Sequence, residues 1–200
     1  MARPRTVSDE QILEAARCCF LEHGPQVSTS TIARALNISS AALFKRFGTK
    51  ENLLIESLAP DEGLAEMLES IAQGPGAGEL REQLTVLLGD MLNHMRGLMP
   101  RIAVIKAAGL DSHVLRERFK EPPPLMMLKG LTGWFSRACD QELIRDLEPQ
   151  VAAIALMGAI QIRPFMKHML GVGEETIGDD AAYIVALVDL MLENLRPAAE

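Results

Sequence analysis

Apolar residues recur along this chain with the period of an α-helix. Ile12, Ala16 and Phe20, for example, lie four residues apart, which places them on one face of a helix. No stretch alternates apolar and polar residues for long enough to indicate a strand, and the chain has only one Trp, one Tyr and six Phe. The pattern therefore predicts an all-α protein.

Helix-capping residues divide the first part of the chain into short helices. A hydroxyl or carboxylate residue before an apolar repeat favours a helix start, and glycine after it favours an end. Gly24 and Gly48 are predicted to end the first and third helices, and Asn37 provides the turn between the second and third. The predicted caps are Ser8 or Asp9, Ser28 or Thr29, Ser39 and Thr49.

The clearest break in the chain is the sequence GPGAG at residues 74–78. The fourth helix begins before it with KENLLIESLA. After it, the apolar pattern predicts helices at 79–98, 100–108, 111–119, 123–141, 149–170 and 177–195.

The third helix carries small residues where a core helix would carry large ones. Leu43 and Phe47 define its inward side, so Ala41 and Lys45 fall nearly opposite. A helix can enter a DNA major groove when its leading residues let it approach the base edges, which favours a helix-turn-helix. The alternative is a small-residue helix packed against another helix, although Lys45 and Arg46 would then be poorly accommodated.

Charge is distributed unevenly along the chain. The whole chain has a net charge of −7, yet residues 1–50 hold seven Lys and Arg against four acidic residues. This asymmetry predicts nucleic-acid contact confined to the N-terminal part, and chance clustering is the alternative.

The stretch QVSTSTIARALNISSAALFKRFGTKENLL, residues 26–54, resembles the DNA-binding signature of the TetR family of bacterial one-component transcriptional regulators. Residues 12–24 are similar to the first helix of that family. The resemblance implies an N-terminal three-helix DNA-binding head with a helix-turn-helix in residues 1–52. A larger helical ligand-binding and dimerisation bundle (about nine helices) would follow in residues 53–200.

By position, the resemblance assigns DNA-binding roles to several residues. Serine and threonine hydroxyls at the start of the second helix would meet phosphates, the third helix would read bases, and Lys50 would bind a phosphate. Phe44 departs from the family, which usually has Tyr there with a hydroxyl on the phosphate backbone. Arg3 and Arg5 either form an arm in the minor groove or remain solvated. The assigned residues are Ser28, Thr29, Ser30, Ser39, Ser40, Ala41, Ala42, Phe44, Lys45, Arg46 and Lys50.

Methionines and aromatic residues concentrate in the middle of the chain. A flexible thioether adapts to differently shaped partners, so these residues predict a pocket for a lipophilic effector, with ordinary core filling as the alternative. The predicted pocket residues are Met91, Met95, Met99, Met126, Met127, Trp134 and Phe165.

Two apolar segments, residues about 149–170 and 177–195, are candidates for a homodimer seam. Along the second, the predicted seam stripe is Ile184, Leu187, Val188, Met191, Leu192 and Leu195. An ordinary monomeric core is the alternative.

The sequence thus favours a cytoplasmic repressor that leaves double-stranded operator DNA when a small lipophilic effector binds. The alternative is a helical ligand-binding or protein-interaction bundle that has lost DNA binding. We find no catalytic or metal-ligand motif and no membrane-spanning segment, and we expect no enzyme activity, metal or cofactor. The cysteines, Cys18, Cys19 and Cys139, are predicted to be free thiols of a reducing compartment.

Overall fold

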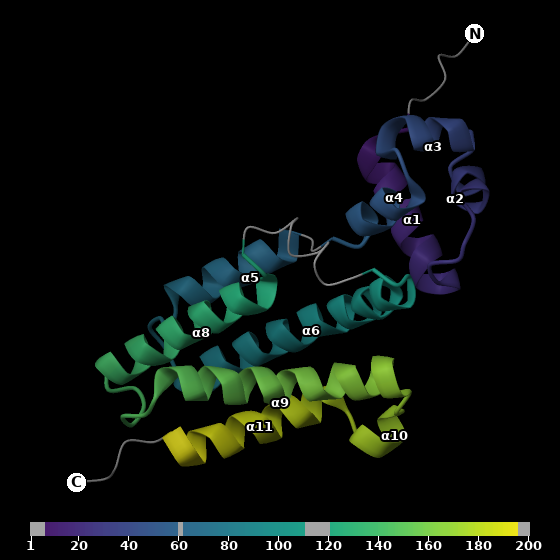
Figure 1. The fold of residues 1–200 in the computed structure, drawn as a ribbon. Coiled ribbons are helices and arrows are strands. Elements are labelled where there is room, and N and C mark those ends of the chain that lie inside the picture. Colours follow the sequence, from purple (N-terminus) through teal and green to yellow (C-terminus); the bar gives the residue numbers. More distant parts are fainter. Residues whose placement is uncertain (1–6, 60–61, 111–120, 196–200) are drawn as a thin grey trace. The chain divides into compact units, whose positions relative to one another are not determined.

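The computed structural model describes residues 7–59, 62–110 and 121–195, and its regular elements there are all α-helices (Figure 1). The predicted fold class is confirmed. The described residues form two compact units, which are residues 7–59 with 100–110 and residues 62–99 with 121–195. The predicted helix at 111–119, like Arg3 and Arg5, lies outside the described residues.

The first unit begins with four short helices in the predicted order. Each starts after a side chain that accepts a hydrogen bond from a backbone N–H three residues later, as the cap prediction requires. The helices are α1 (Asp9–His23), α2 (Thr29–Ala35), α3 (Ser40–Phe47) and α4 (Lys50–Ser57), and their caps are Ser8, Ser28, Ser39 and Thr49.

Left-handed backbone conformations separate these helices. Asn37 has a φ of 55° in the turn between α2 and α3, and Gly48 has a φ of 73° after α3. Both conformations are strained for most residues but accessible to Asn and Gly. The turns on either side of α3 therefore follow from residue types that can be identified in the sequence.

Apolar side chains from all four helices form the core of the first unit. Ile12, Phe20, Ile32, Leu43 and Leu53 are each at most 1% exposed. This burial fixes the inward side of α3, because Leu43 and then Phe47 anchor it four residues apart.

Two arginines hold the segment at the end of α4. Arg17 Nε donates to the carbonyl oxygen of Ser57 at 2.9 Å, and Arg101 Nη1 donates to that of Ala59 at 3.0 Å. These carbonyls lie at or beyond the end of a helix, where intrahelical donors run out. The predicted domain boundary at residues 52 and 53 falls inside α4, whereas the compact units divide after residue 60.

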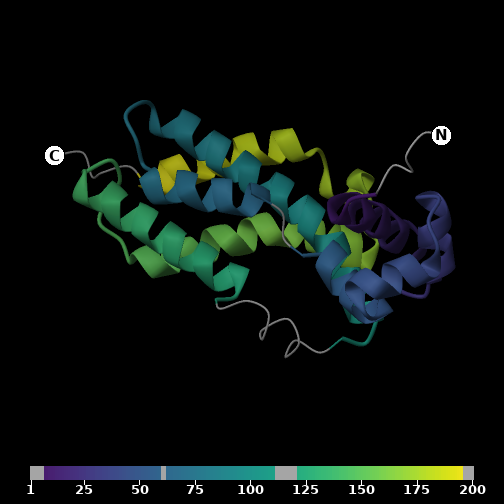
Figure 2. The ribbon, with the colours of Figure 1, turned by 90° about the horizontal axis from the view of Figure 1, so that it is seen from above.

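The second unit is a bundle of longer helices (Figures 1 and 2). Its core joins Leu84, Leu88, Leu131, Phe135 and Ile160, which are all at most 1% exposed. The helices are α5 (Glu62–Gln73), α6 (Leu80–Ala107), α8 (Pro123–Asp140), α9 (Pro149–Leu170), α10 (Glu174–Ile177) and α11 (Asp180–Leu195), of which α6 continues into the first unit.

The predicted break between 98 and 100 is wrong, because α6 runs through Pro100 without interruption. A proline inside a helix lacks one backbone donor and costs about 3 kcal/mol. Val104 and Ile105, which follow it, are buried, so packing outweighs this local cost. The predicted helix at 177–195 begins at Asp180 instead, because the short α10 ends at Ile177. The sequence pattern does not separate α5 from the fourth helix.

A buried arginine ties α9 to the start of α11. Arg163 is 6% exposed, and its Nε and Nη2 lie 2.8 and 2.7 Å from Oδ1 of Asp180. Its guanidinium also lies 4.5 Å from the centre of the Tyr183 ring, and the second carboxylate oxygen of Asp180 pairs with Arg96 of α6. Three helices of the second unit thus converge on one carboxylate.

Candidate nucleic-acid interface and the faces of the second unit

The outward side of α3 is a solvent-facing surface of small, aromatic and basic residues. Ala41 and Lys45 are exposed, Ser40 and Ala42 are partly exposed, and Phe44 is 46% exposed. We call these five residues the reading face. Lys45 makes no ion pair with any described residue, so its charge is available to a partner. Small residues leave room for close approach, which a major-groove helix needs.

Phe44 is a large apolar side chain left uncovered by the described part of the chain. An isolated exposed apolar residue is ordinary on a protein surface, but this one lies beside Ala41, about 60° from it around the helix. A phenyl ring can contact a thymine methyl group or a sugar, and it cannot donate a hydrogen bond to a phosphate.

The structure places Arg46 differently from the reading face. Successive helical residues are rotated by about 100°, so Arg46 points well away from Lys45. Its Nη1 donates to the carbonyl oxygen of Val7 at 2.6 Å and lies 3.1 Å from Oδ1 of Asp9. Of the predicted base-reading residues, Arg46 is therefore the one already bound to another part of the first unit.

The hydroxyl residues around α2 and α3 serve first as helix caps. Ser28 Oγ accepts from the Thr31 N–H at 3.1 Å and lies 2.7 Å from Ser30 Oγ. Ser39 Oγ accepts from the Ala42 N–H at 3.2 Å. Ser28, Ser30 and Ser39 remain exposed and Thr29 is partly exposed, so their remaining lone pairs and protons face solvent. Their phosphate contacts stay predictions.

Lys50 is the first residue of α4 and is partly exposed. Thr49 fixes this helix start by accepting from the Asn52 N–H at 3.0 Å. A lysine at this position presents its charge as the helix begins, where the backbone N–H groups already favour an anion. This geometry suits the predicted phosphate contact.

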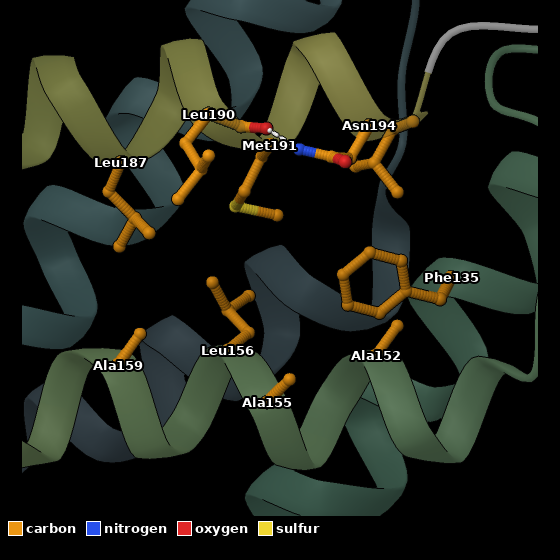
Figure 3. A pocket seen from close by; sticks show the side chains of 10 residues that line it. Phe135, Ala152, Ala155, Leu156, Ala159, Leu187, Leu190, Met191 and Asn194 are labelled. Carbon is orange, nitrogen blue, oxygen red and sulfur yellow. Dashed lines mark hydrogen bonds between the residues drawn. The ribbon is translucent and has the colours of Figure 1, made fainter.

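In the second unit, a cavity of about 220 Å³ lies between α9 and α11 (Figure 3). Leu187, Leu190 and Met191 of α11 point across it toward the small side chains of α9. Asn194 is the polar residue at its edge, and its Nδ2 donates to the Leu190 carbonyl at 2.7 Å. The lining residues are Phe135, Ala152, Ala155, Leu156, Ala159, Leu187, Leu190, Met191, Asn194 and Leu195.

The predicted effector residues do not line this cavity. Met91, Met95, Met127 and Trp134 are buried in the core of the second unit, and Met99 packs against that core. Met126 and Phe165 are exposed. Some of the predicted effector-binding residues are therefore buried and others lie on the surface. That they form a single pocket stays a prediction.

Large apolar side chains are exposed along α9 and α11. On α9, Val151, Ile154 and Ile162 recur at spacings that place them on one helical face. On α11, Val185 and Leu190 are exposed. These two residues lie about 140° apart around α11, so we call only the three residues of α9 the apolar face. The predicted seam stripe on α11 is wrong in part, because Ile184, Val188 and Leu195 are buried in their own unit.

Burial displaces the pKa of several described side chains. It is the main cause that lowers the pKa of His168 and raises those of Cys19 and Tyr183. Beside Tyr183, the Arg163 charge acts in the opposite direction on its pKa. Within the described ranges, no three His, Cys, Asp or Glu side chains are grouped to hold a metal ion, and each helix falls short of what a bilayer crossing requires.

The geometry defines a class of protein, namely an all-α chain with an exposed helix-turn-helix in one compact unit and a separate helical bundle. Comparison with known proteins gives a family match. Residues 12–56 match the family described as "Bacterial regulatory proteins, tetR family". The helix-turn-helix part of the chain is therefore similar to the DNA-binding region of TetR-family regulators.

Among curated proteins, the chain is similar to the HTH-type transcriptional repressor AcnR of Corynebacterium glutamicum. The two are 33% identical over 81 residues, which cover 35% of this chain and 43% of AcnR. The match therefore spans less than half of the relative.

Solved structures match over nearly the whole chain. A TetR/AcrR-family transcriptional regulator from Thermobifida fusca has a TM-score of 0.65 at 21% identity, covering 92% of this chain and 96% of that one. PfmR from Thermus thermophilus has a TM-score of 0.65 at 22% identity, with 96% and 100% covered. FadR from Bacillus subtilis, solved with stearoyl-CoA, has a TM-score of 0.62 at 21% identity, with 93% and 96% covered. At these identities the likeness establishes the fold.

Proposed function

We propose that the chain is a sequence-specific DNA-binding transcriptional regulator that represses its target as a homodimer. The observation that carries the proposal is the reading face, where Ala41 and Lys45 are open to solvent on a helix anchored by Leu43 and Phe47. The family match and the similarity to the repressor AcnR support the same function.

The apolar face supports the dimer. One helix-turn-helix reads few base pairs, and two-fold dimers present two reading helices about 34 Å apart or a multiple of that distance. Exposed Val151 and Ile154 would be covered by a second copy, and the cavity between α9 and α11 would receive side chains from it.

A small lipophilic effector would release the regulator from DNA. Any such effector must bind the DNA-free conformation more tightly, and DNA must then weaken effector binding by the same factor. The methionine-rich interior of the second unit supports an apolar ligand, and the relative FadR was solved with stearoyl-CoA.

DNA binding is tested by enriching random duplex DNA with the purified protein. The proposal predicts one enriched, roughly palindromic sequence whose affinity falls steeply as salt rises. Failure to enrich any sequence, or equal affinity for the enriched and scrambled duplexes, would instead favour a bundle that has lost DNA binding. The absence of a hydroxyl at Phe44 and the net charge of −7 are the features that favour this second function.

Effector binding is tested through Trp134, the single tryptophan of the chain, which is 3% exposed in the core of the second unit. Long-chain acyl compounds are titrated while tryptophan emission and binding of the enriched duplex are followed. We expect a saturable emission change with the same midpoint as DNA release. Saturable binding with unchanged DNA affinity would exclude induction by that compound.

A further inference from the structure

We propose that Arg46 is a positioning residue that fixes α3 against the start of α1, and that it does not itself contact DNA. The proposal rests on the proposed DNA-binding function and revises the role expected for one residue of α3. Its basis is the pair of contacts from Arg46 Nη1 to the Val7 carbonyl at 2.6 Å and to Asp9 Oδ1 at 3.1 Å.

The contacts join two segments that are distant in sequence. Arg46 is in the last turn of α3, whereas Val7 directly precedes Ser8, the cap of α1. One guanidinium nitrogen thus holds both the chain that enters α1 and a carboxylate in its first turn. A charge-assisted hydrogen bond to a backbone oxygen constrains direction, which a pair of mobile side chains alone does not.

Bonding partners, and not burial, distinguish Arg46 from the reading face, since Arg46 is itself an exposed residue. The Arg46 side chain is 32% exposed, although its backbone position on a surface helix would let a free arginine extend into solvent. Lys45, the next residue, is exposed and makes no ion pair within the described chain. Two adjacent basic residues on one helix therefore have different environments.

The contact also neutralises a negative charge in the DNA-binding unit. Asp9 stabilises the N-terminus of α1 through the helix dipole, yet a free carboxylate in the DNA-binding unit would repel phosphates. Arg46 offsets that charge locally. The pair is neutral as a whole, so it contributes orientation without adding a net phosphate-binding charge.

The test measures two quantities on the enriched duplex. The first is the slope of log affinity against log salt, whose magnitude falls by about 0.9 for each phosphate that the protein no longer neutralises. The second is the specificity ratio, meaning affinity for the enriched duplex divided by affinity for a scrambled one. Neutralising a phosphate affects mainly the slope, whereas orientation of the reading face affects the ratio.

The decisive variant carries Asp9→Asn and Arg46→Gln together, because this pair of changes preserves net charge. We expect the wild-type salt slope and a specificity ratio lowered about fivefold, as for an exposed charge-assisted contact. Arg46→Gln alone should lower the ratio equally, since that single change already removes the guanidinium. Lys50→Gln is the matched control and should lower the slope while leaving the ratio unchanged.

A reduced slope in the double variant would overturn the proposal, because it would show that Arg46 binds phosphate. An unchanged ratio and unchanged slope would also overturn it. If circular dichroism shows that Arg46→Gln does not fold, Asp9→Ala is used in its place. That variant removes the carboxylate contact to Arg46 and must lower the specificity ratio. Absence of any enriched sequence for the wild-type protein would instead refute the proposed function.

Discussion

The reading face of α3 and the apolar face of α9 are both open to solvent, yet they differ in the charge and size of their residues. The reading face combines small side chains and the ring of Phe44 with a cation, Lys45, that forms an ion pair with none of the described residues. The apolar face presents branched side chains, of which Ile154 is 54% exposed. A small, charged surface suits a polyanion that must come close, whereas an apolar one gains free energy only when another apolar surface covers it.

A charge placed on the apolar face should have the largest effect. We expect Ile154→Glu to raise the dimer dissociation constant by at least roughly 100-fold, since both copies would bury an unpaired carboxylate. Analytical ultracentrifugation measures the change. Val86→Glu is the control, because Val86 is 61% exposed on α6, outside this face. Equal dimerisation of both variants would refute the assignment of the face.

A negative charge on the reading face tests the other surface. We expect Ala41→Glu to weaken binding to the enriched duplex by roughly 100-fold, because a carboxylate would meet phosphates and acceptor-rich base edges. A gel-shift titration measures it, and circular dichroism should show unchanged helix content because Ala41 is exposed. Val86→Glu should bind DNA like the wild type.

The ion pair between Asp180 and Arg163, which joins α9 to α11, can be tested by substitution. Asp180→Asn removes the charged partner of buried Arg163, and we expect the free energy of unfolding to fall by about 2 kcal/mol. Asp189→Asn is the matched control on the same helix, because its pair with Arg81 is about half exposed. The control should change stability by less than about 0.5 kcal/mol. Denaturant unfolding measures both, and equal decreases would contradict the structural role of Arg163.

On the first unit, a smaller effect is expected from Lys50→Ala. Binding to all duplexes should weaken and the salt slope should fall by roughly one unit, because one phosphate is no longer neutralised by the protein. Titrations at several salt concentrations with enriched and scrambled DNA measure this. A change of sequence preference at constant slope would show that Lys50 reads a base.

The smallest effect concerns His168, near the end of α9. Its pKa is lowered from 6.5, first by burial and then by Lys167, so the unfolded chain binds more protons between the two pKa values. The free energy of unfolding should therefore rise as the pH increases through that window. Below the window, the protonation of His168 no longer adds to this change. Thermal unfolding between pH 5 and 7.5, compared with His168→Gln, measures the difference, and identical profiles would contradict it.

The sequence predicts the first unit well because its signals are local. Ser39, Gly48 and Thr49 act within three or four residues, so their chemistry can be read without knowing the rest of the chain. The inward and outward sides of α3 follow from the same short range, through Leu43 and Phe47.

The remaining features depend on contacts between distant residues. Nothing near Arg46 in sequence indicates Val7 or Asp9 as its partners, and nothing near Pro100 indicates that packing carries α6 through it. On α11, helical periodicity shows which residues share a side of the helix. It does not show which side packs against the core of the same unit. Ile184 and Val185 are adjacent, and only their burial separates core from surface.

The arginine contacts at the end of α4 bear on how the first unit of this chain could be joined to another protein. α2 and α3 are too short to be stable in isolation, and Ala59 is held by Arg101, which comes from beyond the middle of the chain. A chimaera joined at residue 52 would cut α4 and discard that donor. A transplanted DNA-binding module should instead include residues 7–59 and retain an arginine equivalent to Arg101 in the recipient.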